Sequence, residues 1–208
     1  LYVEEFQAFC KKEGSWLDNY ALFMALKDAH DGRPWSQWEA PYRTLEPLSI
    51  EIARQELADD IDYYRFVQYI FYKQWAILKD YAASKHITII GDIPIFVALD
   101  SADVWADQQL FNLDENGFPT VVAGVPPDYF SATGQLWGNP LYLWKNHRKD
   151  GYRWWIRRIR HQLRLTDMLR IDHFRGFEAY WSIPYGEETA IHGKWVTGPG
   201  TDFFDAVI

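Results

Sequence analysis

The sequence has 208 residues, of which 29 are acidic and 21 basic, so its net charge at pH 7 is −8. Such an acidic chain would repel a polyanion, which makes nucleic acid a poor partner. Cys10 is the only cysteine, so an internal disulfide is excluded and a reducing, cytoplasmic location is expected, or a plastid if the source is a plant.

No apolar run approaches the ~20 residues that a membrane-spanning helix needs, and no signal peptide is recognisable, so no membrane partner is expected. The chain starts with Leu1 and not with Met. We therefore expect it to be an internal part of a longer protein.

Residues 1–85 show helical patterns and no motif that carries chemistry. Ser15 and Asp18 are spaced as in a capping box, which predicts that a helix begins at Ser15 and ends before Gly32. A longer helix is predicted from seven side chains that share one stripe at helical spacing: Ile61, Tyr64, Gln68, Phe71, Trp75, Leu78 and Ala82. We interpret this part as a helical cap or insertion that supports a larger core.

Residues 87–90 form a short run in which every residue is β-branched, which predicts a buried strand. Gly91 and Asp92 follow at once, so Asp92 is expected at the carboxyl end of the strand. In parallel α/β folds this is the end that carries the chemistry. The alternative is a turn residue whose carboxylate caps a nearby amide.

Residues 111–122 contain Asn116 and Gly117 between two apolar stretches, which predicts a hairpin turn. A calcium loop is rejected, because the twelfth position needs a bidentate Glu and holds Ala123.

Residues 124–140 are rich in Pro, Gly and Ser and predict a long loop. Aromatic rings that such a loop cannot easily bury lie among polar side chains: Asp128, Tyr129, Phe130, Gln135, Trp137 and Asn139. Rings can stack on the faces of a sugar, while amides and acids bond its hydroxyls. The alternative is a loop packed against the rest of the domain.

A helical pattern with an arginine-rich edge over residues 152–164 leads into a short apolar run at 168–171, which predicts a second buried strand. Side chains alternate along a strand, so Arg170 and Asp172 share one face. Arg170 should keep Asp172 ionised, and a held carboxylate can act as a nucleophile. The alternative is a structural ion pair. His173 could bond a substrate hydroxyl or the backbone.

Three segments in this order resemble the 4-α-glucanotransferase family, which includes amylomaltase and disproportionating enzyme. They are Gly-Asp-Ile-Pro-Ile-Phe-Val with Asp-Ser-Ala-Asp-Val-Trp in residues 91–105, residues 121–144, and Arg-Ile-Asp-His-Phe-Arg-Gly-Phe in residues 170–177. The resemblance implies an α/β fold that is part of a (β/α)8 TIM barrel. Residues 1–85 would be a helical insertion subdomain with a lead-in helix, and residues 86–208 would belong to the barrel and carry a substrate-binding loop.

The resemblance also implies that α-1,4-glucans are the substrates, namely maltooligosaccharides derived from starch or glycogen. Asp172 would be the nucleophile of a retaining transfer, Asp92 a sugar-binding residue, and Tyr129 part of a flexible loop over the substrate groove. No metal or organic cofactor is expected, because two carboxyls suffice for this reaction.

The family's acid/base Glu belongs to a motif like Ala-Glu-Asp-Leu-Gly on a later strand, and this sequence ends before such a motif. We therefore expect the 208 residues alone to be inactive. Two alternatives stay open, an α-amylase-like glucan hydrolase and a non-catalytic glucan-binding module in which Asp172 is only structural.

Overall fold

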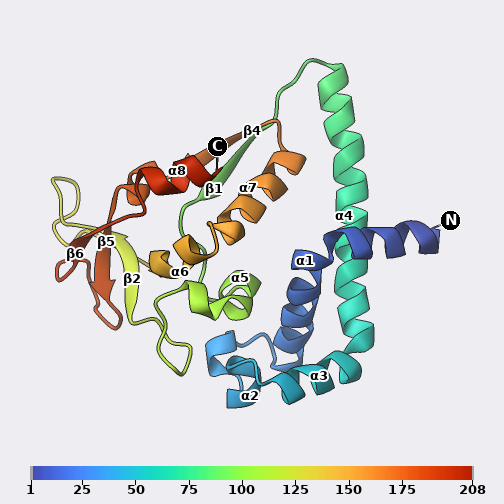
Figure 1. Cartoon of the computed structure of the whole chain (residues 1–208), viewed down its shortest axis with the longest axis horizontal. Coiled ribbons are helices and arrows are strands. Elements are labelled where there is room, and N and C mark those ends of the chain that lie inside the picture. The colour runs from blue at the N-terminus through green and yellow to red at the C-terminus, as the bar shows by residue number, and fades with distance from the viewer. Residues whose placement is uncertain (1, 208) are drawn as a thin grey trace. The chain divides into compact units, whose positions relative to one another are not determined.

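The computed structural model describes residues 2–207 and consists of two compact units (Figure 1). The helical unit runs up to His86 and also contains Asp100–Ala106. The mixed unit contains Ile87–Leu99 and continues from Asp107. No helix within residues 2–207 is long and apolar enough to cross a lipid bilayer.

The helical unit is built around two long helices. Its elements are α1 (Tyr2–Ala29), η1 (Trp35–Gln37), α2 (Ala40–Arg43), α3 (Pro47–Glu56), α4 (Ala58–Ser84) and α5 (Ala102–Ala106). Helix α1 packs along α4 through aromatic rings, with Phe9 5.7 Å from Tyr69 and 5.5 Å from Tyr72 between ring centroids. Aromatic pairs at these separations stabilise the contact beyond their buried area.

The predicted helix start at Ser15 is wrong, because Ser15 lies in the interior of α1. Rings of the preceding turns, Phe6 and Phe9, pack on α4, so tertiary contacts extend the helix past a local capping signal. The predicted stripe on α4 is only partly buried. Phe71 and Leu78 are exposed, whereas Tyr69, outside the stripe, is buried.

The mixed unit contains two sheets and the helices around them. Its elements are β1 (Ile90–Pro94), η2 (Gln108–Leu110), β2 (Val121–Val125), β3 (Gln135–Pro140), α6 (Trp144–Lys149), α7 (Arg153–Leu165), β4 (Met168–Asp172), η3 (Phe174–Phe177), β5 (Ala179–Pro184), β6 (Lys194–Thr197) and α8 (Thr201–Val207). The prediction of an α/β fold is confirmed, and the described strands do not close into a barrel.

The first sheet is a parallel pair in which β1 lies beside β4, with Asp92 opposite Arg170 and Pro94 opposite Asp172. The strand predicted at residues 87–90 is therefore displaced. It begins at Ile90, so Asp92 lies inside the strand and not after it. The bounds of β1 are set by its parallel pairing with β4, in which Ile90 lies opposite Met168, 78 positions later. They are not set by the β-propensity of residues 87–90.

Neither strand of the pair is buried as predicted. Ile90 and Met168 are exposed, while Leu169 and Ile171 are half-buried on the opposite face from Arg170. Within residues 2–207 no further strand pairs with the outer edges of β1 or β4. The face that carries Asp92, Arg170 and Asp172 is exposed to solvent. The predicted alternation along β4 is confirmed.

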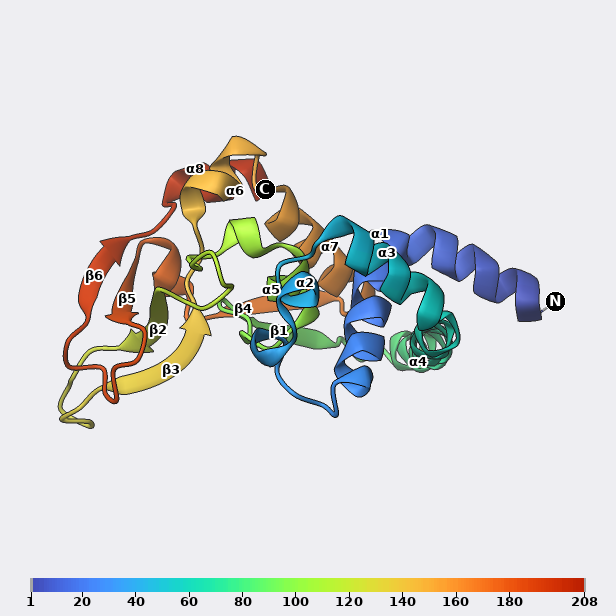
Figure 2. The ribbon, with the colours of Figure 1, turned by 90° about the horizontal axis from the view of Figure 1, so that it is seen from below.

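The second sheet is antiparallel, with strand order β3-β2-β5-β6, and Figure 2 shows these strands side by side. Residues 124–140 are thus not one long loop. Strands β2 and β3 form a hairpin, and only residues 126–134 connect them. The turn predicted at Asn116 and Gly117 is confirmed, with Gly117 at φ 81° and an antiparallel bridge between Leu113 and Pro119.

An aromatic core joins the helices of the mixed unit. Trp155 of α7 is fully buried, with its ring centroid 5.4 Å from Phe177 and 5.4 Å from Phe203. Phe177 and Phe203 stack at 4.5 Å, and Trp144 lies over the same group. Much of the chain's aromatic content in this unit therefore serves packing, since each buried ring removes a large apolar area from water.

Candidate functional site

Three charged side chains meet on the open face of the parallel pair. Arg170 donates through Nη1 to Oδ2 of Asp92 at 2.5 Å and through Nη2 to Oδ1 of Asp172 at 2.6 Å. The register places Asp92 directly opposite Arg170, and Asp172 lies two residues further along the same strand. One guanidinium therefore holds two carboxylates that are 80 positions apart in the chain.

These side chains stay accessible to solvent, with exposed fractions of 60% for Arg170, 54% for Asp92 and 57% for Asp172. Exposed ion pairs add little to stability, typically about 0–1 kcal/mol each. A purely structural role is therefore weakly supported by energetics. No described residue bonds Oδ2 of Asp172, so this oxygen is available to a ligand while Oδ1 is anchored.

His173 follows β4 in the left-handed region, with φ 52°. Its imidazole lies between Trp137, whose ring meets it edge-on at 4.9 Å between centroids, and Phe96 at 6.4 Å. Burial is the main cause that lowers the pKa of His173, Arg175 acts in the same direction, and Asp172 opposes both. A neutral ring near pH 7 follows, able both to donate and to accept.

The two ring nitrogens of His173 differ in access. Nε2 is enclosed and has no hydrogen-bond partner among the described residues, so it cannot meet a ligand as placed. Nδ1 is not enclosed in this way, which leaves it as the ring nitrogen expected to bond a substrate hydroxyl. We call the rings of Phe96, Trp137 and His173 the aromatic wall, and His173 directly follows Asp172 in the chain.

The connection between β2 and β3 presents two exposed rings. Tyr129 is 97% exposed and Phe130 94%, and they meet edge-to-face at 5.6 Å. The alternative of a loop packed against the rest of the domain is therefore wrong for Tyr129 and Phe130. Asp128, expected to bind substrate, accepts from the backbone amides of Phe130 at 2.9 Å and Ser131 at 2.8 Å through Oδ1. Its carboxylate orders the loop that carries the rings.

The remaining predicted site residues lie on β3. The Gln135 side chain accepts from Trp137 Nε1 at 3.0 Å, which orients the indole. Asn139 donates from Nδ2 to the carbonyl of Val97 at 2.9 Å. The structure brings Trp137 to His173, while no ring contact within residues 2–207 joins Tyr129 or Phe130 to them.

Two features escaped the sequence analysis. The first is the bond between Arg170 and Asp92. No sequence pattern indicated that the strands carrying these two residues pair with each other. The second is the contact of Phe96 with His173, although Phe96 belongs to the quoted segment of residues 91–105 and lies two positions after the end of β1.

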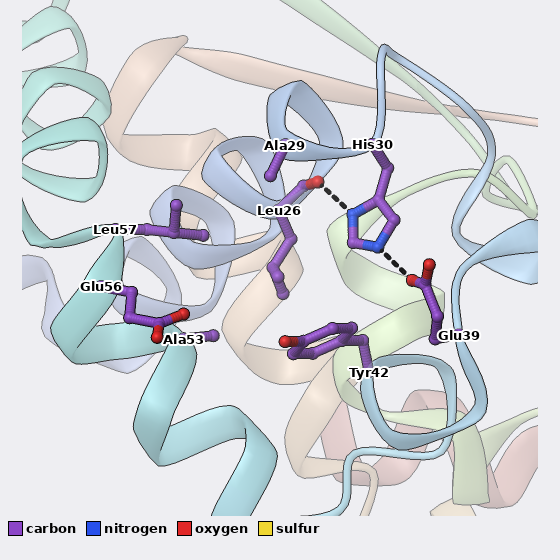
Figure 3. Close-up of a pocket in the computed structure, with 8 residues that line it drawn as sticks. All are labelled: Leu26, Ala29, His30, Glu39, Tyr42, Ala53, Glu56 and Leu57. Carbon is purple, nitrogen blue, oxygen red and sulfur yellow. Dashed lines mark hydrogen bonds and ion pairs between the residues drawn. The ribbon is translucent and has the colours of Figure 1, made fainter.

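The helical unit has a pocket of about 430 Å³ (Figure 3), and none of the predicted site residues lines it. His30 contacts the carbonyl of Leu26 through Nδ1 at 2.6 Å and Glu39 Oε2 through Nε2 at 2.6 Å. A hydrogen bond from the backbone amide of Glu39 lowers the pKa of its carboxyl, and the bond to His30 adds to this. These contacts fasten the segment before α2 to the end of α1.

Within residues 2–207 no group of three or more His, Cys, Asp or Glu side chains is arranged to hold a metal ion.

Comparison with known sequences matches residues 2–208 to the family described as 4-alpha-glucanotransferase. A 4-alpha-glucanotransferase of Thermus thermophilus is 53% identical over 204 residues, which are 98% of this chain and 41% of the relative. One from Synechocystis is 50% identical over 205 residues, with the same coverage. The chloroplastic/amyloplastic enzyme of Solanum tuberosum is 47% identical over 194 residues, 93% of this chain and 34% of its own length.

Solved structures of two amylomaltases are also similar to this chain. Amylomaltase from Streptococcus agalactiae, in complex with acarbose, superposes with a TM-score of 0.94 at 41% identity, over 99% of this chain and 41% of that one. Amylomaltase from Corynebacterium glutamicum gives a TM-score of 0.78 at 18% identity, over 99% of this chain and 26% of that chain, which shows a shared fold. The chain spans about two fifths of the length of the bacterial relatives it matches.

Proposed function

Because the chain belongs to the 4-alpha-glucanotransferase family, we propose that it forms part of an enzyme that moves α-1,4-glucan segments between maltodextrins with retention of configuration. The observation that carries the proposal is the clamp of Arg170 on Asp92 and Asp172 at the open face of a parallel strand pair. The fold supports it, since β1 and β4 would be two strands of a (β/α)8 barrel with residues 1–85 as a helical insertion.

In the first half of the reaction, Oδ2 of Asp172 would attack C1 of a glucose unit while the leaving-group oxygen takes a proton from an acid. The bond formed is a glucosyl ester, and the bond broken is the glycosidic one. Anchoring Oδ1 on Arg170 orients the attacking carboxylate, which lowers the cost of reaching the reactive geometry. Asp92, held as an acceptor on the same guanidinium, suits hydrogen bonds from sugar hydroxyls.

In the second half, a hydroxyl of an acceptor glucan would attack C1 and release Asp172. Retaining enzymes need a second carboxyl ~5–5.5 Å from the nucleophile as acid and then base. No residue of this chain is assigned that role, which motivates the expectation that the 208 residues alone do not turn over.

The aromatic residues suit recognition of the two glucans. Trp137 contacts His173, which directly follows Asp172, and Tyr129 and Phe130 offer uncovered ring faces on an ordered loop. Rings that stack an acceptor sugar favour its attack over that of water. This favours a transferase over an α-amylase-like hydrolase. Because Cys10 is the only cysteine, which suits a reducing compartment, we propose that the protein acts in the cytoplasm, or in a plastid if its source is a plant.

The test uses the polypeptide as its gene encodes it, incubated with maltotriose. We expect longer glucans to appear together with glucose, and Asp172→Asn to remove turnover while glucan binding persists. Glucose without longer products would indicate a hydrolase. Binding without any chemistry in the unmodified protein would indicate a glucan-binding module, and disproportionation by the isolated 208 residues would contradict the expected need for a further carboxyl.

A further inference from the structure

Residues 94–97 cover the last residue of β1 and the irregular segment that follows it, and side chains from other elements bind their backbone carbonyls. Arg158 Nη2 donates to the carbonyl of Pro94 at 2.8 Å, and Nη1 donates to that of Ile95 at 3.2 Å. Tyr142 Oη also donates to Ile95 at 2.7 Å, and Asn139 binds Val97. Side chains thus bind three of the four carbonyls, and two of these three, on Ile95 and Val97, lie beyond the end of the strand.

Arg158 is itself held firmly. It projects from α7, and its guanidinium lies over the rings of Trp155, at 4.8 Å from the centroid, and Trp154, at 5.5 Å. Both tryptophans are buried, as is Tyr142, whose hydroxyl lies 3.5 Å from Nη1. A planar group stacked on buried rings presents its donors in a fixed direction, which a flexible ammonium does not.

The segment held in this way adjoins the candidate site on both sides. Pro94 is the register partner of Asp172, and Phe96 contributes its ring to the wall against His173. A displacement of residues 94–97 would therefore move the strand end beside the nucleophile and one support of the histidine. Among the described residues, the hydrogen bonds of Arg158 go to Pro94, Ile95 and Tyr142 and not to Asp172 or His173.

We propose that Arg158 is a positioning residue, which fixes the main chain of residues 94–97 and through it the placement of Asp172 and His173. The expected effect on turnover rests on the proposed transferase function. The effect on the conformation of residues 94–97 does not, and hydrogen exchange alone can test it. Arg158 does not touch the reacting atoms. Its role is to keep the end of β1 and the unpaired residues 95–97 in one conformation.

The test compares three variants of the polypeptide as its gene encodes it. Arg158→Met keeps the stem on the tryptophans but removes the donors, Arg158→Lys keeps one charge-bearing donor group, and Arg160→Met alters an exposed arginine of the same helix as the control. For Arg158→Met we expect kcat for maltotriose disproportionation to fall ~10²-fold, because small displacements of reacting groups cost rates of that order, with KM much less affected. Arg158→Lys should recover part of the rate, and Arg160→Met should match the unmodified protein.

Hydrogen exchange separates positioning from a loss of folding. We expect Arg158→Met to speed exchange of the peptide covering residues 94–99 while exchange in β2 and β5 stays unchanged. Unchanged exchange at 94–99, an unchanged kcat, or an equal loss in Arg160→Met would each overturn the proposal. If the unmodified protein shows no transfer, the proposed function fails, and the exchange comparison still decides whether Arg158 fixes the segment.

Discussion

Replacing Arg170 by Lys tests whether the charged cluster on β1 and β4 serves catalysis or stability. Lysine keeps the positive charge but has one ammonium in place of a planar fork. It cannot donate to Asp92 and Asp172 from two fixed nitrogens, as Arg170 does at 2.5 and 2.6 Å. The substitution therefore removes the shared geometry and leaves most of the charge balance intact.

The magnitude expected for stability is small. All three side chains are more than half exposed, and exposed pairs of this kind are worth about 0–1 kcal/mol each. Since Lys retains part of the attraction, the free energy of unfolding should change by no more than about 1 kcal/mol. The transfer rate should fall by ~10²-fold, because Asp172 loses the bond that orients it.

The assay follows maltotriose disproportionation and urea unfolding on the same preparations. Arg65→Lys is the matched control, since Arg65 also bridges two aspartates, Asp18 at 2.7 Å and Asp62 at 2.9 Å, but belongs to the helical unit. We expect it to leave the rate unchanged. A loss of several kcal/mol in Arg170→Lys, or an unaltered rate, would refute the reasoning.

Two further predictions concern groups outside the clamp. Burial lowers the pKa of His147 from 6.5 to about 4, so between these values the unfolded chain binds a proton that the folded chain does not, and stability falls as the pH falls. The loss from this group between pH 7 and 4 is about 3 kcal/mol, and urea unfolding of His147→Leu should lack it; an identical pH slope in both proteins would contradict this. Tyr129→Ala and Phe130→Ala should weaken glucan binding, because each removes an uncovered ring worth about 1.5–3 kcal/mol when fully buried, while unfolding changes by less than about 0.5 kcal/mol. Calorimetric titration with maltooligosaccharides measures the first effect, and unaltered affinity in both variants would remove these rings from the proposed binding surface.

Local patterns decide those parts of this protein in which one short segment sets its own conformation. The helix expected at residues 152–164 occurs at Arg153–Leu165, and the strand expected at 168–171 occurs at Met168–Asp172. Alternation along that strand placed Arg170 and Asp172 on one face, as period-two geometry requires. The turn at Asn116 and Gly117 likewise needs only a residue that tolerates positive φ.

Only the tertiary structure decided what depends on pairing between distant segments. The partner of Asp92 is Arg170, because β1 begins three residues later than the predicted strand and continues to Pro94 in register with β4. The last part of the predicted loop, Gln135–Pro140, forms β3, because it pairs with β2 in antiparallel orientation. Ser15 does not cap a helix, because the turns of α1 that precede it pack their rings against Tyr69 of α4. In each case hydrogen bonds or buried area from a remote element outweighed a local preference worth about 1 kcal/mol or less.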